Sequence, residues 1–355
     1  MILRTAVAAL LLTALAPAAI VGAAWAQTPS PVVGGETIGT PELVAAACAE
    51  GKVVYYTAQR DADERQIVQK FQQAFPCIQV SVISAVTGRL YERLQTENQA
   101  GMTQADLTII TDEALTQRLV ESKMLRPWTP PQAGLFAANA KQDGWWYAAS
   151  GALMYLIVNT QTVSEADAPK SWADLVDPRW HGNLSMAPVT TGGTSWMQFD
   201  LMKLKLPPSY LPALAAQQPK VFSAYAAVAQ SVARGETWVG IIDSLDDYPL
   251  RVGQGAPIRP VYPTEGVPIV NYPMMLLAAA PHRHAAELFG NWYLSKVAQA
   301  ELVRLRGVYS FRADVAPAPG NLPLAGINLW NPGHDAVLRD HDSLVNEIIQ
   351  IFGRR

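Results

Sequence analysis

The sequence predicts an α/β protein built as two lobes, and three observations support this prediction. The N-terminal third alternates short β-rich runs with helical segments, which implies a mostly parallel sheet covered by helices. Two later apolar runs, residues 145–159 and 267–280, are long enough to cross from one lobe into the other and back. The 355 residues, of which 50% are hydrophobic and 16% charged, allow about two domains at roughly 150 residues each.

The first 26 residues have the layout of a secretory signal peptide. Arg4 supplies a positive charge, residues 6–24 carry none, and Ala24-Trp25-Ala26 forms a small-x-small cleavage site before Gln27. The most apolar stretch, residues 6–20, is shorter than the roughly 20 residues of a membrane-spanning helix. Because no cysteine lies near the cleavage site, we expect no lipid anchor. We therefore expect export to the periplasm and a mature chain that begins near Gln27.

The elements of the first lobe follow in order along residues 27–150. Each predicted strand is a short run rich in β-branched and apolar residues, and each helix places apolar residues three or four positions apart. In the first helix, for example, Ile67 and Phe71 share one face, and Pro76 ends the segment. The expected strands are Val53–Tyr56, Ile78–Ile83 and Asp106–Ile110, and the helices that alternate with them are Asp61–Phe75, Gly88–Asn98 and Glu113–Ser122.

Proline-rich segments and the two long apolar runs divide the rest of the chain. We expect residues 151–268 to form the second lobe, and residues 269–355 to return to the first lobe and end in helices. Because the chain crosses twice between the lobes, the cleft between them is the expected ligand site. The further elements are helices at 195–204, 224–234, 285–305 and 343–352, and a buried strand at 237–243.

Cys48 and Cys77 are the only cysteines of the chain, and we expect them to form a disulfide. An even number of cysteines in an exported chain is typical of a disulfide. Each cysteine lies just ahead of an apolar strand pattern, so both reach the same edge of the sheet if these strands are parallel neighbours. The alternative is a pair of buried free thiols.

Three segments resemble the periplasmic ferric-ion-binding protein family. The stretch Gly51-Lys52-Val53-Val54-Tyr55-Tyr56-Thr57-Ala58 resembles its opening strand, and residues 170–180 with Gly182 resemble its linker into the second lobe. The stretch 291–312, with Gly307-Val308-Tyr309-Ser310-Phe311-Arg312 at its end, is similar to its closing helix and turn. Together the matches run from about Cys48 to Val315.

The resemblance implies the type II periplasmic binding protein fold. Each lobe is then a mixed, mostly parallel sheet flanked by helices, and two hinge crossovers join the lobes. The resemblance also implies a small-molecule ligand and, as partner, the membrane permease of an ABC importer. Members of the wider group take up ferric iron, phosphorylated sugars, phosphonates, thiamine and other small organic solutes, so the ligand stays open.

The metal ligands of the iron-binding members are where this sequence departs from the family. The resemblance places Arg60 where those members have a histidine, Asp112 where they have a glutamate, and Leu245 with Asp246 where they have a tyrosine pair. Ferric iron prefers anionic oxygen ligands, and a guanidinium cannot ligate a cation. We therefore expect no metal site, with ferric-iron binding kept as the alternative function.

A glycine-rich turn ahead of a helix is the first candidate for ligand binding. Thr191, Gly192, Gly193 and Thr194 precede the predicted helix at 195–204. Glycines let backbone N–H groups approach a ligand, and the start of a helix carries partial positive charge, so this turn suits a phosphate, phosphonate or carboxylate. The alternative is an ordinary helix cap. The turn also matches the anion-binding turn of the resembled family.

Two arginines and one tyrosine are further candidates. Arg60 follows the first strand at its carboxyl end, where α/β folds place ligands, and a guanidinium there can hold an anion with two hydrogen bonds. The alternative for Arg60 is a surface salt bridge to Asp61 or Asp63. Arg89 opens the next helix and is a candidate of the same kind, and Tyr225 matches a ligand-contacting position of the family.

Carboxylates gather after two strands of opposite lobes. Asp243 and Asp246, with Asp247, follow the strand of the second lobe, and Asp112 follows the third strand of the first. These carboxylates can receive an ammonium or hydroxyl group of a ligand, or they can be a solvated loop. If both kinds of candidate face the cleft, the ligand is a small anionic or zwitterionic organic solute.

Composition and motifs argue against other classes of function. A net charge of −3 and a pI near 6.0 give no reason to expect nucleic acid or an anionic membrane as partner. The segment 193–197 lacks the closing glycine of a nucleophile elbow, and His282 with His284 lacks a third metal ligand. We expect a monomer without enzyme activity or cofactor, and a secreted hydrolase is the remaining alternative.

Overall fold

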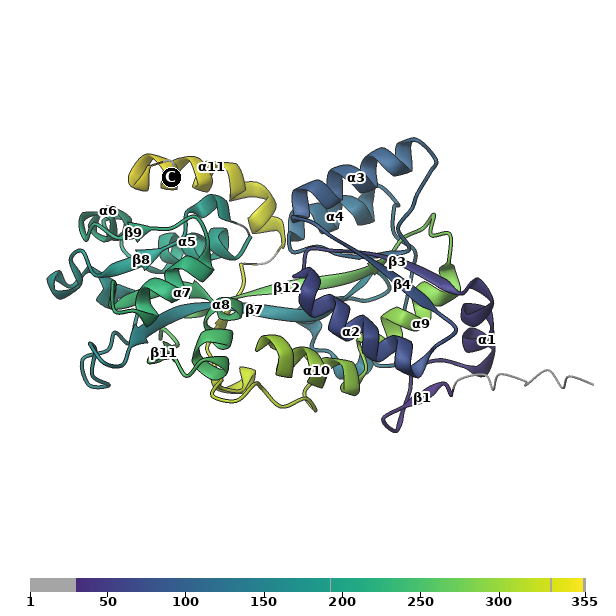
Figure 1. The fold of residues 1–355 in the computed structure, drawn as a ribbon. Coiled ribbons are helices and arrows are strands. Elements are labelled where there is room, and N and C mark those ends of the chain that lie inside the picture. The colour runs from purple at the N-terminus through teal and green to yellow at the C-terminus, as the bar shows by residue number, and fades with distance from the viewer. Residues whose placement is uncertain (1–29, 192, 333, 354–355) are drawn as a thin grey trace, which may run out of the picture.

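Two lobes lie side by side in the structure, a computed structural model that describes residues 30–191, 193–332 and 334–353 (Figure 1). Two long strands run through both lobes, β7 (Trp146–Asn159) and β12 (Val267–Leu276). The expected signal peptide and its cleavage site before Gln27 lie outside the described residues. None of the described helices is long and apolar enough to cross a membrane.

The first lobe alternates strands and helices as the sequence predicts. Its strand β3 pairs in parallel with both β4 and β5, and β12 joins the sheet antiparallel to β5. A small hairpin of β1 and β2 precedes these elements. The bounds are β1 (Val32–Val33), β2 (Glu36–Thr37), α1 (Pro41–Glu50), β3 (Lys52–Thr57), α2 (Asp61–Ala74), β4 (Gln79–Ser84), α3 (Thr87–Gln99), β5 (Leu107–Ile109), α4 (Glu113–Glu121) and β6 (Lys141–Gln142).

The second lobe continues the same sheet. Strand β10 pairs antiparallel with β7 and in parallel with β8, so the main strand order across both lobes is β4-β3-β5-β12-β7-β10-β8-β9. The α/β fold with two strands crossing between the lobes is therefore confirmed. The bounds are β8 (Leu184–Met186), α5 (Gly193–Lys205), α6 (Tyr210–Ala216), β9 (Lys220–Val221), α7 (Tyr225–Ala233), β10 (Val239–Asp243), α8 (Ser244–Tyr248) and β11 (Ile258–Val261).

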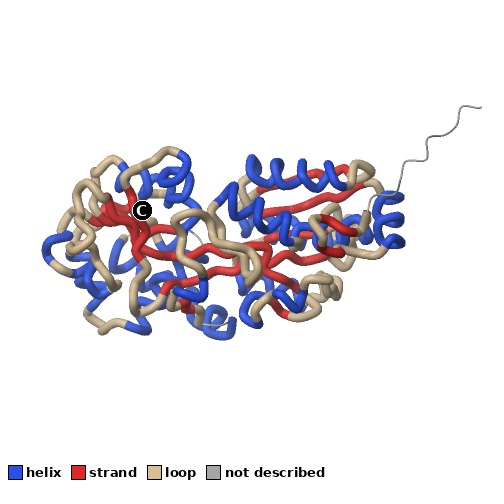
Figure 2. The backbone as a smooth tube through the Cα atoms, turned by 90° about the horizontal axis from the view of Figure 1, so that it is seen from below, coloured by secondary structure: helices blue, strands red, loops and turns tan. Residues whose placement is uncertain are grey.

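The hinge strands β7 and β12 pair side by side through the middle of the molecule (Figure 2). Asn271 lies opposite Gly151 and Tyr272 opposite Ser150, and the register shifts directly after Tyr272. Because successive side chains of a strand point to opposite faces, Tyr272 and Asn271 face opposite sides of the hinge. Side chains from the two faces of β12 therefore belong to different surroundings.

The return to the first lobe differs from the prediction in one respect. The expected single helix at 285–305 is two helices, α9 (Arg283–Tyr293) and α10 (Lys296–Arg306). Ser295 has extended backbone angles between them, and its side chain accepts a hydrogen bond from the Ala298 amide at 3.4 Å as the cap of α10. A serine cap competes with helix continuation for the backbone N–H groups. The apolar periodicity continues through this break, which is why the sequence did not reveal it.

The chain ends in β13 (Leu329–Trp330) and a long helix, α11 (His334–Phe352), which begins nine residues before the predicted start at Ser343. Helix α11, yellow in Figure 1, packs against α5 and α6 of the second lobe and against α4 of the first. The Trp196 ring stacks on the His341 ring with centroids 5.9 Å apart, and the Trp196 Nε1–H donates to the His341 carbonyl at 3.2 Å. The C-terminal helix therefore touches both lobes.

Cys48 and Cys77 are bridged, as predicted, with Cα atoms 5.2 Å apart. Their strands β3 and β4 are parallel neighbours, which places both residues at one edge of the sheet. Nearby, His282 Nδ1 lies 3.0 Å from Asp106 Oδ2, and His284 Nδ1 lies 2.7 Å from Glu50 Oε1. These histidines tie α9 to the edge of the first lobe rather than pairing with each other.

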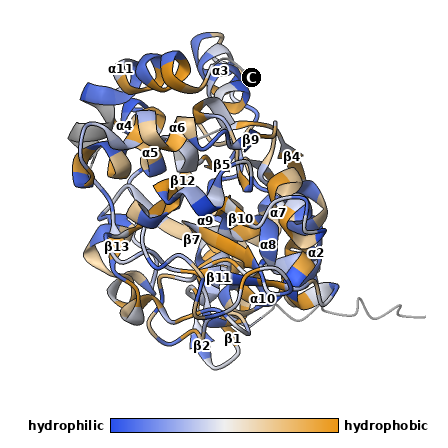
Figure 3. Cartoon of the chain, turned by 90° about the vertical axis from the view of Figure 1, so that its left-hand side faces the viewer, coloured by the Kyte–Doolittle hydropathy of each residue, from blue (hydrophilic) through white to orange (hydrophobic). Residues whose placement is uncertain are grey.

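The hydrophobic core runs through both lobes along the central strands. In Figure 3 strands near the centre, such as β10, carry hydrophobic colours, while the outer helix faces and loops are mostly hydrophilic. Gly307 shows how closely the lobes pack. It caps α10 at φ 65°, and an added Cβ would lie 2.2 Å from the Tyr248 ring of α8. A glycine at this position allows the left-handed turn and the contact together.

Candidate functional site

Two carboxyl groups of the second lobe form the centre of the candidate site. Asp243 ends β10 and caps α8 by accepting a hydrogen bond from the Leu245 amide at 2.9 Å, and it is only 4% exposed. Asp246 follows in α8 and is partly buried. Burial and the neighbouring Asp246 raise the pKa of Asp243 to about 7, and burial raises the pKa of Asp246 to about 6. A hydrogen-bond donor or a positive charge nearby would therefore stabilise the ionised form of both groups.

Three buried hydroxyl groups surround Asp243. Thr194 and Ser195 lie in the first turn of α5, and Tyr225 begins α7. The Thr194 hydroxyl lowers the pKa of Asp243, against the larger effect of burial, and Ser195 donates to the Pro188 carbonyl at 2.8 Å. The Tyr225 hydroxyl has no hydrogen bond of acceptable geometry among the described residues, although Ser195 and Asp243 are near enough to shift its pKa. Buried polar groups normally have partners, so this hydroxyl is available to a ligand.

Arg60 brings a positive charge to these carboxylates from the first lobe. It precedes α2 after β3, and its side chain is 55% exposed. Its Nε lies 2.9 Å from Asp63 Oδ2, and its charge lowers the pKa of Asp246, although burial raises that pKa more. The surface salt bridge to Asp63, which the sequence left as an alternative, is thus present. The same guanidinium is also within electrostatic reach of the second lobe.

Tyr272 of the hinge strand β12 lies against the same carboxylates, and the sequence did not point to it. It is 6% exposed, and its pKa is raised by burial and by Asp243 and Asp246, while Arg306 lowers it. Helical and strand periodicity marks Tyr272 as one apolar residue among many in a long run. Its place in the site follows from strand alternation within the hinge, which becomes clear once the pairing of β7 and β12 is known.

Arg306 is a second residue that the sequence did not reveal. It ends α10, is 2% exposed, and lies 3.3 Å from Glu64 Oε1 and 3.5 Å from Asp63 Oδ2. It also donates to the Gln59 side chain, 247 residues earlier in the chain. Burial raises the pKa of Glu64 to about 7 in spite of Arg306. This network fixes the start of α2, next to Arg60.

The third carboxylate of the acidic segment is fixed inside the protein. Asp247 is fully buried, accepts a hydrogen bond from the Tyr155 hydroxyl at 2.7 Å and lies 3.1 Å from Arg251 Nε. A solvated loop, which was the alternative for the whole acidic segment, is therefore wrong for Asp243 and Asp247. The charge of Asp247 compensates that of Arg251, whereas Asp243 and Asp246 lie near the hydroxyl groups of Thr194 and Tyr225.

The remaining predicted residues lie around the site or apart from it. Asp112 caps α4 by accepting from the Leu115 amide at 2.9 Å and lines a cavity of about 20 Å³ with Trp196 and His341. The Thr191 hydroxyl is buried without a partner among the described residues, Gly193 begins α5, and Gly192 lies outside those residues. Arg89 is exposed in the first turn of α3, and no described contact joins it to the cleft.

The described residues hold no group of three or more His, Cys, Asp or Glu side chains that could bind a metal ion. Leu245, at one position of the family's tyrosine pair, packs against the hydrophobic core. Two phenols do lie beside the carboxylates, those of Tyr225 and Tyr272. The start of α5 and the guanidinium of Arg60 thus favour an anionic group of a ligand, and the neighbouring carboxyl groups favour hydrogen-bond donors of the same ligand.

Solved structures of low sequence identity share this fold over nearly their whole length. The chain is similar to iron-bound HitA from Pseudomonas aeruginosa, with 22% identity, a TM-score of 0.72, and 84% of this chain and 99% of that chain covered. It is also similar to AfuA from Actinobacillus pleuropneumoniae, with 21% identity, a TM-score of 0.71, and coverage of 86% and 99%. The ferric ion-binding protein A of Pasteurella haemolytica gives 14% identity, a TM-score of 0.72, and coverage of 86% and 99%. These likenesses confirm the periplasmic binding protein fold.

Sequence comparisons identify the family of the chain. An uncharacterized protein of Haemophilus influenzae is 30% identical over 149 residues, which are 40% of this chain and 43% of that protein. The chain thus spans less than half the length of this curated relative. The family model described as bacterial extracellular solute-binding protein matches residues 103–323, more than half of the chain. The chain therefore belongs to the bacterial extracellular solute-binding protein family, a family of binding proteins rather than enzymes.

Proposed function

We propose that the protein is the periplasmic solute-binding component of an ABC importer and that its cleft captures a small anionic or zwitterionic organic solute. The anionic group, a phosphate, phosphonate or carboxylate, binds between the start of α5 and Arg60. Hydroxyl or ammonium groups of the same solute donate to Asp243 and Asp246. The membrane permease of the importer is the partner, and the leader at residues 1–26 directs export. Residues 27–150 with most of the return segment 269–355 form one lobe, residues 151–268 form the other, and helix α11 contacts both.

The proposal rests on one observation. The Tyr225 hydroxyl is unpaired in the described part of the chain, and it lies near the start of α5 and near two carboxyl groups, Asp243 and Asp246, whose pKa values are raised. Thr194, Tyr225 and Asp243 are at most 8% exposed, and the Tyr225 hydroxyl is without a hydrogen-bond partner among the described residues. Leaving such groups unpaired costs stability, so the site gains from a ligand that bonds them. A neighbour, AfuA, is described with fructose 6-phosphate bound, which combines an anionic head with hydroxyl donors.

The residues of the site come from both lobes, and this indicates a clamp mechanism. Arg60 belongs to the first lobe, and α5 with Asp243 and Asp246 belongs to the second. An anion that touches both Arg60 and α5 is bound better when the lobes are together than when they are apart. A ligand shifts such an equilibrium only by its difference in affinity for the two states.

Isothermal titration tests the proposal against its alternatives. The probes are fructose 6-phosphate, 2-aminoethylphosphonate, sodium acetate and ferric citrate, each titrated into protein from which bound small molecules were removed by unfolding and refolding. We expect saturable binding of an organic phosphate or phosphonate and no binding of iron. Iron binding with a strong visible absorption band, and no binding of the organic anions, would identify a ferric-binding protein instead.

A further inference from the structure

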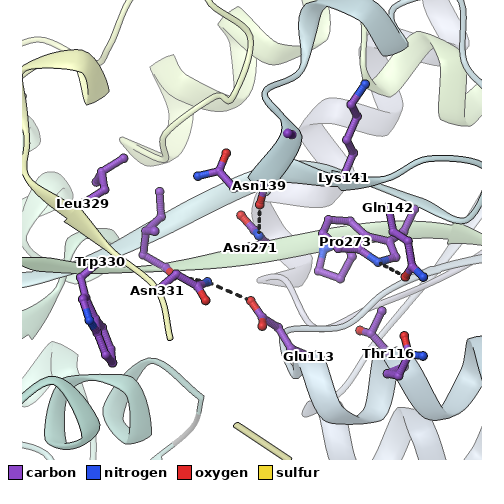
Figure 4. Close-up of a pocket in the computed structure, with 14 residues that line it drawn as sticks. Glu113, Thr116, Asn139, Lys141, Gln142, Asn271, Pro273, Leu329, Trp330 and Asn331 are labelled. Atoms are coloured by element: carbon purple, nitrogen blue, oxygen red, sulfur yellow. Dashed lines mark hydrogen bonds between the residues drawn. The ribbon is translucent and has the colours of Figure 1, made fainter. Parts of the chain in front are cut away.

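A hollow lies on the opposite face of the hinge from the candidate site. It has a volume of about 650 Å³, which is in the range of small-molecule sites. Its floor is formed by Ile269, Asn271 and Pro273 of β12, while Tyr272, between them, belongs to the candidate site on the other face. Figure 4 shows Asn139 above the strand and Glu113 below it, with Asn271 between them. The hollow is therefore built on the same strand as the candidate site.

Asn271 gives this hollow an unpaired acceptor. The residue is 4% exposed, its Nδ2 donates to the Asn139 carbonyl at 2.8 Å, and its Oδ1 is buried without a hydrogen-bond partner among the described residues. A half-paired amide on the floor of a hollow is costly unless a ligand or water completes it. In Figure 4 Asn271 lies at the centre of the labelled residues that line the hollow.

The lining of the hollow favours an uncharged, hydroxyl-bearing molecule. Its polar groups are mostly amides, which donate and accept at once and so match hydroxyl groups. The positive charge of Lys141 is compensated by Asp143 at 3.1 Å, and Glu113 Oε1 accepts from the Asn331 amide at 3.2 Å. Trp330 of β13 and Trp146 of β7 also line the hollow, and the Trp146 Nε1 donates to Gln142 at 3.0 Å. Aromatic rings together with amides suit a saccharide or cyclic polyol.

We propose that this hollow is an accessory binding site for a neutral saccharide or polyol. Glu113, Lys141 and Trp146 belong to elements of the first lobe. Asn331 follows β13 and precedes α11, which packs on α5 of the second lobe. The lining of the hollow therefore comes from the first lobe and from the segment that leads to the C-terminal helix.

The test uses the full mature protein and four neutral probes, which are D-glucose, maltose, trehalose and myo-inositol. Saturation-transfer difference NMR detects binding, and isothermal titration measures it. We expect at least one probe to bind with a Kd on the order of 1 mM or tighter. Asn271→Leu and Asn139→Ala should each weaken that binding at least tenfold. The exposed Asn98→Ala, on α3 away from the hollow, should leave it unchanged.

The variant Arg60→Ala separates this site from the candidate site in the cleft. It should leave saccharide binding intact even if it abolishes binding of organic anions. Circular dichroism confirms that each variant is folded, and Asn139→Ala serves if Asn271→Leu is not. The accessory site would be overturned if none of the four probes bound, or if both asparagine variants bound the probe as tightly as the wild type. Loss of saccharide binding in Arg60→Ala would overturn it as well. None of these results bears on whether organic anions bind in the cleft.

Discussion

Arg60 and Asp246 lie on different lobes, and the guanidinium of the first lowers the pKa of the second, which burial raises. The two residues are 186 positions apart in the chain, and the fold alone brings their charges within reach. Arg60 also pairs with Asp63 at 2.9 Å. One cation of the first lobe therefore lies within electrostatic reach of a buried acceptor of the second.

Replacing Arg60 by alanine should weaken binding of an organic phosphate or phosphonate by about tenfold to a hundredfold. The expected loss is about 1.5–3 kcal/mol, the usual contribution of a hydrogen bond to a charged group. Arg65→Ala is the matched control, because Arg65 lies on the same helix, is exposed and pairs only locally with Asp61 at 2.6 Å. Isothermal titration with fructose 6-phosphate and 2-aminoethylphosphonate measures both variants. Equal losses of affinity in both variants would mean that Arg60 acts through its long-range charge rather than through contact with the ligand.

The contribution of Asp243 to the stability of the protein should fall as the pH rises from about 4 to about 7. The pKa of Asp243 is raised to about 7 in the folded protein, whereas an unfolded aspartate titrates near pH 4. Between these values the folded state binds more protons than the unfolded state, so its stability decreases with increasing pH. Asp243→Asn removes this contribution, because an amide does not titrate, and it retains the helix cap of α8.

Thermal unfolding at pH 4 and pH 8 tests this prediction. The melting temperature of Asp243→Asn should fall less between the two values than that of the wild type, and Asp61→Asn, at an exposed carboxylate of α2, should behave like the wild type. A steeper fall in Asp243→Asn than in the wild type would show that Asp243 is ionised and well compensated in the folded protein.

Asp247 and Asp246 are adjacent, yet their replacement by asparagine should have different consequences. Asp247 is fully buried and holds Tyr155 and Arg251, so removing its charge leaves a buried cation and should destabilise the protein by about 3–5 kcal/mol. Asp246→Asn should change stability little and change ligand affinity instead. Urea unfolding of both variants measures the difference. A stable Asp247→Asn protein with impaired binding would place Asp247 in the ligand site.

Replacement of both Cys48 and Cys77 by serine should lower the stability by about 3–4 kcal/mol, the chain-entropy estimate for a loop of 29 residues. Urea unfolding of the double variant and of the oxidised wild type measures this loss. Alkylation of unfolded, unreduced wild type should modify no cysteine. Two modified thiols would show that the bridge does not form in the protein.

The alternating elements of the first lobe and the two crossings could be predicted because their signals are local. Strand β3, helix α2 and strand β7 each show the right apolar period within a single segment, and both cysteines precede neighbouring strands. The break between α9 and α10 was missed because Ser295 interrupts the backbone without interrupting the apolar pattern. The early start of α11 was missed because its first turns lack a clear apolar stripe.

The candidate site was predictable in part. Asp243, Asp246 and the turn before α5 follow strand and helix ends, where ligand residues tend to lie, and Arg60 does so in the first lobe. Tyr272 and Arg306 could not be found in this way, because their neighbours in the site are distant in sequence. Asp247 could not be told apart from Asp246 either, since its partner Tyr155 is 92 residues away.

Native mass spectrometry of the protein isolated from the periplasm without unfolding tests the anion site most directly. We expect a fraction of the protein to carry one added small organic mass, which collisional activation releases as an anion or zwitterion. Wild type and Arg65→Ala should retain this mass, and Arg60→Ala should lose most of it. A bound mass equal to a single iron ion, or a bound solute retained equally by Arg60→Ala, would contradict the proposed anion site.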